Sequence, residues 1–211
     1  MATGLRELKK HQTRQAISDT ATRLFLERGF EAVTIAEIAA AAQVAKMTVT
    51  NYFPRKEDLA LDFHETFRGS LAAALDSREK GESALAGLRR EYLAAVDRQD
   101  ALAGFAGPEF ARMIIDSPTL AARLRELHQQ REDALAEALA VATGARAGSL
   151  APRAAAALLA AAHRTLFQHA LDLVIAGRTN RQLADALPEA AEEVFALLEP
   201  SLADYAVREA P

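Results

Sequence analysis

The sequence predicts an all-α protein, with a small three-helix domain at the N-terminus and a larger helical domain behind it. Apolar residues recur at helical spacing almost from end to end of the 211 residues, and alternating runs typical of strands are missing. Glycine and proline fall where such helices should end or begin. We place the smaller domain at residues 1–54 and the larger one at residues 55–211.

The first expected helix covers about residues 6–28 and ends before Gly29, which suits the left-handed position after a helix. Thr34 and Glu37 then form a capping box, in which each side chain satisfies a free amide of the other residue. This pattern predicts a short helix from residue 35 to about residue 42.

A third helix is expected at about residues 46–53, because a fresh amphipathic stretch ends there at Pro54. Two short helices joined by a tight turn are typical of a helix-turn-helix motif, whose second helix enters the major groove of DNA. Ile38, Val49 and Phe53 would point inward. The polar or rim positions of the second helix are Lys46, Met47, Thr48, Thr50, Asn51 and Tyr52.

The charge distribution agrees with a nucleic-acid partner for the first domain only. The net charge is −4, yet residues 1–60 hold nine Lys or Arg against seven Asp or Glu. The remaining residues hold sixteen against twenty-two. An N-terminal segment with an excess of basic residues can contact phosphates, while the acidic remainder of the chain makes no contact with them.

Beyond residue 53, helical periodicity predicts helices at about residues 54–76, 83–100, 107–115, 118–142, 152–177 and 182–207. The last two are the most apolar, so we expect them to form half of a four-helix bundle across a homodimer, the alternative being a purely intramolecular core. Ala154–Ala162 would allow close helix approach. The second apolar face would comprise Leu187, Ala190, Ala191, Val194, Leu197 and Leu198.

The first 60 residues resemble the TetR/AcrR family of regulators. The resemblance rests on Val33-Thr34-Ile35, Ile38-Ala39, Tyr52-Phe53 and Lys56-Glu57-Asp58-Leu59, together with Leu24-Phe25, Gly29-Phe30, Val44, Lys46 and Thr48. Two positions depart from the family, which often has glycine at residue 43, here Gln43, and serine at residue 45, here Ala45. Both lie in the turn and affect the pose of the following helix.

The resemblance implies a repressor that binds an inverted-repeat operator in double-stranded DNA as a homodimer and is released by a small-molecule effector. It assigns phosphate contacts to Thr34, Tyr52 and Lys56, and places Lys46, Met47, Thr48, Thr50 and Asn51 in or beside the major groove. Two alternatives remain open. Residues 34–53 could be a plain αα-hairpin, or the regulator could be controlled by a protein partner or by its abundance.

An effector pocket would lie within the larger domain, enclosed by the helices at about 83–100, 107–115, 118–142 and 152–177. Pockets for organic molecules need apolar walls and a few orienting polar groups. Phe105, Phe110, Met113 and Phe167 could supply the walls and either His163 or His169 the polar group, although such aromatics are more often ordinary core. The charged stretches at Arg123–Glu126 and Arg131–Asp133 are interpreted as solvated helix faces.

Other function classes find little support. The chain has no cysteine, and His163 and His169 are six residues apart, so they cannot share a metal at helical spacing. No phosphate-binding loop or catalytic motif is present either. We expect no enzyme activity, no metal and no cofactor. Without a signal peptide or a membrane-length apolar run, we expect a cytoplasmic protein.

Overall fold

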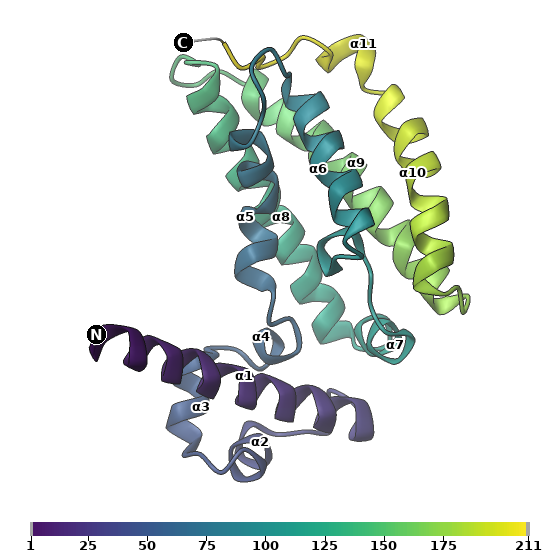
Figure 1. Ribbon diagram of the computed structural model, residues 1–211. Coiled ribbons are helices and arrows are strands. Elements are labelled where there is room, and N and C mark those ends of the chain that lie inside the picture. Colours follow the sequence, from purple (N-terminus) through teal and green to yellow (C-terminus); the bar gives the residue numbers. More distant parts are fainter. Residues whose placement is uncertain (1, 210–211) are drawn as a thin grey trace. The chain divides into compact units, whose positions relative to one another are not determined.

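The computed structural model describes residues 2–209, with side chains from residue 7 onward, and helices are the regular elements of that part of the chain (Figure 1). The prediction of an all-α fold is confirmed. The helices divide into two compact units, one of residues 1–64 with 112–123 and one of residues 65–111 with 124–211. Among the described residues, no helix combines the length and apolarity that a membrane span requires.

The first unit contains α1 (Ala2–Arg28), α2 (Ile35–Ala41), α3 (Lys46–Tyr52) and α4 (Lys56–Ala60), with the end of α7 (Pro108–Asp116) and the start of α8 (Pro118–Ala142). Its core comes from residues that are 3% exposed or less. They include Ile17, Ala21, Phe25, Phe30, Val33, Ile38, Ala39, Val49, Phe53 and Leu59. Ile17, Ala21 and Phe25 lie on the predicted face of α1, whereas Phe30 and Val33 lie in the segment between α1 and α2.

The turn between α2 and α3 has the two irregular features that its sequence suggested. Gln43 adopts a left-handed φ of 55°, where glycine would meet no steric penalty. Ala45 is the N-cap of α3 and makes no side-chain capping hydrogen bond. Thr34 and Glu37, in contrast, form the predicted capping box at the start of α2.

The predicted single helix at residues 54–76 is wrong, because α4 ends at Ala60 and α5 (His64–Asp76) begins after a break. Leu59, Ala60 and Leu61 are all 4% exposed or less. The chain leaves the helical conformation at Leu61, whose φ and ψ of −105° and 55° are not helical.

The second unit contains α5 from Glu65 onward, the start of α7 and most of α8. It also contains α6 (Ala84–Asp97), η1 (Ala101–Ala103), α9 (Ala151–Ile175), α10 (Asn180–Ala196) and α11 (Glu199–Leu202). The helix α10 packs against α9 and α6. The predicted helix at 182–207 is broken near Leu198 (Figure 1). Pro200 lacks the amide needed to continue the α-helical pattern, and the chain restarts as the short α11.

Candidate nucleic-acid interface and internal cavity

Helix α3 presents a polar surface over an apolar base. Val49 and the following Phe53 are fully buried, which fixes the orientation of the helix on the first unit. The opposite face is open, since Met47 is 70% exposed and Lys46 and Asn51 are exposed as well. Thr48, Thr50 and Tyr52 are half-buried at its edges. The predicted groove-facing residues therefore lie together on one accessible surface.

The side chains on this surface differ in their present partners. The Thr50 hydroxyl donates to the Met47 carbonyl of its own helix at 3.1 Å. Among the described residues, the Asn51 amide makes no hydrogen bond, so both its donors and its acceptor face outward. An amide with a free donor and a free acceptor suits adenine, which offers both groups at its major-groove edge.

Thr34 is the N-cap of α2 and is linked to Arg28 through Glu37. Its hydroxyl donates to Glu37 Oε2 at 2.8 Å and accepts from the Glu37 amide at 3.3 Å. Glu37 in turn accepts from Arg28 Nη2 at 2.7 Å. The hydrogen bonds from Arg28 and Thr34 lower the pKa of Glu37 to about 2. The exposed cap thus has an ionised carboxylate at the positive end of the helix.

Lys56 is directed toward the turn that follows α1. Its Nζ donates to the Phe30 carbonyl at 2.5 Å and lies 4.2 Å from the Phe30 ring centroid. Burial lowers the pKa of this ammonium. Lys56 therefore joins α4 to the segment between α1 and α2, while the phosphate contact that the family resemblance implies stays a prediction.

A buried ion pair connects α4 to the start of α8 within the first unit. Asp58 and Arg123 have side chains that are 6% and 9% exposed. Arg123 donates to Asp58 Oδ1 from Nε at 3.0 Å and from Nη2 at 2.8 Å. The interpretation of Arg123 as part of a solvated face is therefore wrong. Its spacing of three residues from buried Leu120 and four from buried Leu127 was the signal that placed it inward.

A second link in the same unit lies at the start of α8. The Ser117 hydroxyl donates to Glu31 Oε1 at 2.6 Å and accepts from the Leu120 amide at 3.2 Å. Ser117 therefore caps α8 and ties it to the segment before α2. The hydrogen bonds from Ser117 and Thr119 lower the pKa of Glu31.

The second unit contains a cavity of about 510 Å³ between α5, α6, α8 and α9, and this cavity is partly open to solvent. Leu71, Leu88 and Ala95 contribute to its apolar walls, and Tyr92, Arg131 and His163 contribute polar atoms. Its volume lies in the range of small-molecule sites. The predicted walls included α7, whereas the structure has α5 in its place.

The predicted ligand residues do not all reach this cavity. His163 lines it, and Phe167 is buried in an aromatic cluster with Phe67 and His128, at centroid distances of 5.7 and 5.4 Å. Phe105 and Phe110 belong to the same unit but are not among the lining residues, and Met113 belongs to the first unit. Ligand contact by Phe105, Phe110, Met113 and Phe167 stays a prediction.

Sequence reasoning missed Tyr92 and Arg131 as cavity residues. Arg131 is 5% exposed, so its assignment to a solvated face is also wrong. It lies four residues before the fully buried Leu135 and four after the buried Leu127, which is core spacing. Tyr92 Oη and His163 Nε2 are buried without a hydrogen-bond partner among the described residues.

Comparison with known proteins gives the family of the first unit. Residues 17–63 match the family described as bacterial regulatory proteins, tetR family. The HTH-type transcriptional regulator TcmR of Streptomyces glaucescens is 32% identical over 147 residues, which cover 67% of this chain and 65% of TcmR. The aligned part thus spans slightly less than two thirds of that relative's length.

Solved structures share the whole fold. NalD, the secondary repressor of the MexAB-OprM multidrug efflux pump in Pseudomonas aeruginosa, is 22% identical, with coverage of 92% of this chain and 98% of NalD and a TM-score of 0.56. SmeT, solved as a complex with triclosan, is 17% identical, with coverage of 95% and 96% and a TM-score of 0.57. With its helix-turn-helix and this all-helical fold, the chain belongs to the tetR family of bacterial regulatory proteins.

Proposed function

We propose that the protein is a homodimeric, sequence-specific repressor that binds an inverted-repeat operator through α3 and is released by a small molecule in the cavity of the second unit. The exposed polar face of α3, held on a buried apolar base, carries this proposal. Residues 1–54 would form the DNA-binding domain and residues 55–211 the sensing and dimerisation domain. The cavity favours a small-molecule effector over control by a protein partner or by abundance alone, which would need no cavity of this size.

The links of α8 to the first unit support a route for regulation. Arg123 and Ser117 fasten the start of α8 to Asp58 on α4 and to Glu31. The helix continues to Ala142 and carries Arg131 in the wall of the cavity. An effector would release DNA only if it bound the conformation that does not bind DNA more tightly than the conformation that does. Tight binding to both conformations would therefore not suffice.

The DNA part is tested by selection of bound duplexes from a random pool with the full chain. We expect an inverted repeat to be enriched. Asn51→Ala and Thr50→Ala should each reduce binding to the selected duplex by about 1–3 kcal/mol while leaving non-specific binding intact. Asn180→Ala is the matched control, because this exposed asparagine lies on α10. Unchanged sequence preference in both α3 variants would contradict the assignment.

Salt titration separates phosphate contacts from structural ones. Lys46→Ala should reduce the slope of log K against log salt by about one unit without loss of stability. Lys56→Ala should lower the stability of the protein, because its ammonium bonds the Phe30 carbonyl. If Lys56→Ala instead leaves stability unchanged and reduces the salt slope, Lys56 contacts phosphate as the family resemblance implies.

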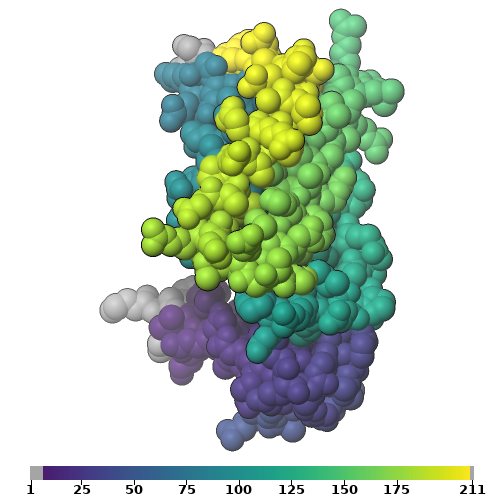
Figure 2. All heavy atoms as spheres, turned by 90° about the vertical axis from the view of Figure 1, so that its right-hand side faces the viewer, coloured from purple at the N-terminus to yellow at the C-terminus, as the bar shows by residue number. Residues whose placement is uncertain are grey.

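The homodimer would use the outward faces of α9 and α10, which lie side by side on one side of the second unit (Figure 2). Leu158 and Leu197 are 45% and 77% exposed there, whereas Leu187 and Ala191 of the predicted face are buried inside the unit. Leu197→Glu should yield monomers in sedimentation and weaken operator binding. Leu150→Glu, at a position 74% exposed, is the control, and a dimer that persists in Leu197→Glu would contradict this interface.

A further inference from the structure

The cavity of the second unit has a buried cation in its wall. Arg131 is 5% exposed, and its Nε donates to the Ser70 hydroxyl at 2.7 Å. The guanidinium carbon lies 4.5 Å from the centroid of the Phe67 ring. These contacts hold the side chain in one place without neutralising it, because a hydroxyl and an aromatic ring carry no net charge.

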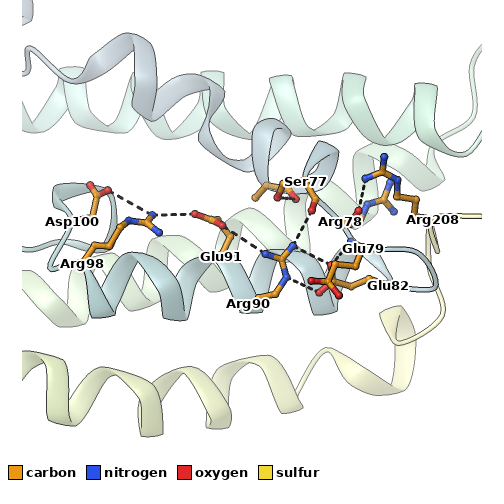
Figure 3. Close-up of polar contacts among 10 residues, drawn as sticks. Ser77, Arg78, Glu79, Glu82, Arg90, Glu91, Arg98, Asp100 and Arg208 are labelled. Atoms are coloured by element: carbon orange, nitrogen blue, oxygen red, sulfur yellow. Dashed lines mark hydrogen bonds and ion pairs between the residues drawn. The ribbon is translucent and has the colours of Figure 1, made fainter.

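Among the described residues, Arg131 has no carboxylate within ion-pair distance, and its two terminal nitrogens have no hydrogen-bond partner. Other arginines of the unit differ. Figure 3 shows Arg98 between Glu91 and Asp100, and Arg90 against Glu82. Arg98 also lines the cavity, so the cavity has one paired arginine and one unpaired arginine.

The groups nearest to Arg131 do not supply a negative charge. Burial lowers the pKa of His163 well below its usual range, and Arg131 lowers it further, so this imidazole is neutral at neutral pH. His128 behaves in the same way, with a pKa of about 4. Burial raises the pKa of the Tyr92 hydroxyl, which therefore stays protonated. Two carboxylates, Glu65 and Glu91, also line the cavity, but among the described residues neither lies within ion-pair distance of Arg131. The lining also holds two unsatisfied polar atoms, Tyr92 Oη and His163 Nε2.

We propose that the cavity binds an organic monoanion, a carboxylate on an apolar body, whose carboxylate pairs with Arg131. A buried charge is strongly disfavoured unless it is paired, and the planar guanidinium offers two parallel donors that match a carboxylate. Tyr92 Oη is placed to donate a further hydrogen bond to the ligand, and the apolar walls receive its body. A single cation favours a monoanion over a doubly charged phosphate.

This inference rests on the proposed function only in naming the bound molecule as the effector. Ligand class is therefore measured without DNA, by isothermal titration of the full chain with two matched pairs of probes. The pairs are 2-naphthoate with 2-naphthamide and octanoate with octanamide. We expect the anion of at least one pair to bind roughly tenfold or more tighter than its neutral amide. Equal binding of anion and amide in both pairs, or binding of neither anion, would overturn the proposal.

Variants of Arg131 test whether this residue causes the preference for the anion over its neutral amide. Arg131→Met should abolish the preference for the anion, and Arg131→Lys, which keeps the charge, should retain part of it. Arg98→Met is the matched control, because Arg98 lines the same cavity but already has carboxylate partners. If Arg98→Met loses the preference for the anion and Arg131→Met retains it, the anion pairs with Arg98 and the proposal is overturned.

DNA binding of the same preparations separates the two conclusions. A protein that binds its selected duplex but shows no preference for anions contradicts the ligand class and leaves the proposed function standing. A protein that binds no duplex specifically contradicts the proposed function, whatever the probes show. The preference for anions, which depends on Arg131 alone, would then still stand as a property of the cavity.

Discussion

Arg123 and Arg131 lie eight residues apart on α8, and both are buried, yet they belong to different units and have different partners. Arg123 donates two hydrogen bonds to Asp58. Arg131 bonds the Ser70 hydroxyl and packs on Phe67, with no carboxylate within ion-pair distance among the described residues. The two sites thus differ in whether the chain itself supplies the compensating negative charge.

The comparison indicates how the two units divide their tasks. In the first unit, Asp58 and Arg123 pair with each other and fix α4 and the start of α8 in one arrangement. In the second unit, a charge remains for a partner that the chain does not contain, and it lies in the wall of a cavity. An unpaired buried charge lowers stability. Such a cost is typical of sites that bind a ligand.

The largest expected effect comes from breaking the pair in the first unit. Asp58→Asn removes the carboxylate that accepts two hydrogen bonds from the buried Arg123, which should lower the free energy of unfolding by about 3–5 kcal/mol. Urea unfolding followed by circular dichroism measures this, since the chain has no tryptophan. The double variant Asp58→Leu with Arg123→Met should recover most of the loss. A single variant as stable as the wild type would show that the pair does not fix α4.

Acidic pH should weaken the second unit through its buried imidazoles. The folded pKa of His128, about 4, lies below its unfolded value, so its contribution is complete above about pH 6.5 and is lost as the pH falls toward 4. Between pH 7.5 and pH 5 this loss is about 2 kcal/mol for His128, and His163 adds to it in the same direction. In His128→Leu the pH dependence should become shallower. An unchanged slope would mean that the pKa of His128 is the same in the folded and the unfolded protein.

The smallest effect concerns the turn of the first unit. Ala45 caps α3 without a side-chain hydrogen bond, so Ala45→Ser should raise the free energy of unfolding by about 0.5–1 kcal/mol. Ala40→Ser, at an exposed position inside α2, is the matched control and should lower it by about 0.5 kcal/mol. Equal changes in both variants would show that the serine hydroxyl does not cap α3.

Much of the first unit could be predicted because its signals are local. The capping box of Thr34 and Glu37, the glycine after α1 and the apolar spacing of α2 and α3 each act within a few residues. The helix break at Leu61 could not be placed in the same way, although its three consecutive buried apolar residues are visible in hindsight. A local apolar run does not tell which of its residues face the same core.

The cavity and the buried arginines were harder to predict because they depend on packing between distant segments. Arg123 and Arg131 stand among other charged residues, and that context is typical of a solvated face. Their spacing to Leu120, Leu127 and Leu135 contained the opposite signal. Tyr92 and His163 meet only because α6 and α9 pack together, with ring centroids 5.6 Å apart.

The most direct test of the difference between the two units is the same substitution at the two arginines of α8, measured by urea unfolding without ligand. Arg123→Met leaves Asp58 buried and unpaired, so the free energy of unfolding should fall by about 3 kcal/mol. Arg131→Met removes an unpaired buried charge, so the free energy of unfolding should stay unchanged or rise by up to about 2 kcal/mol. A loss in Arg131→Met as large as that in Arg123→Met would contradict the assignment of Arg131 as a charge kept for a ligand.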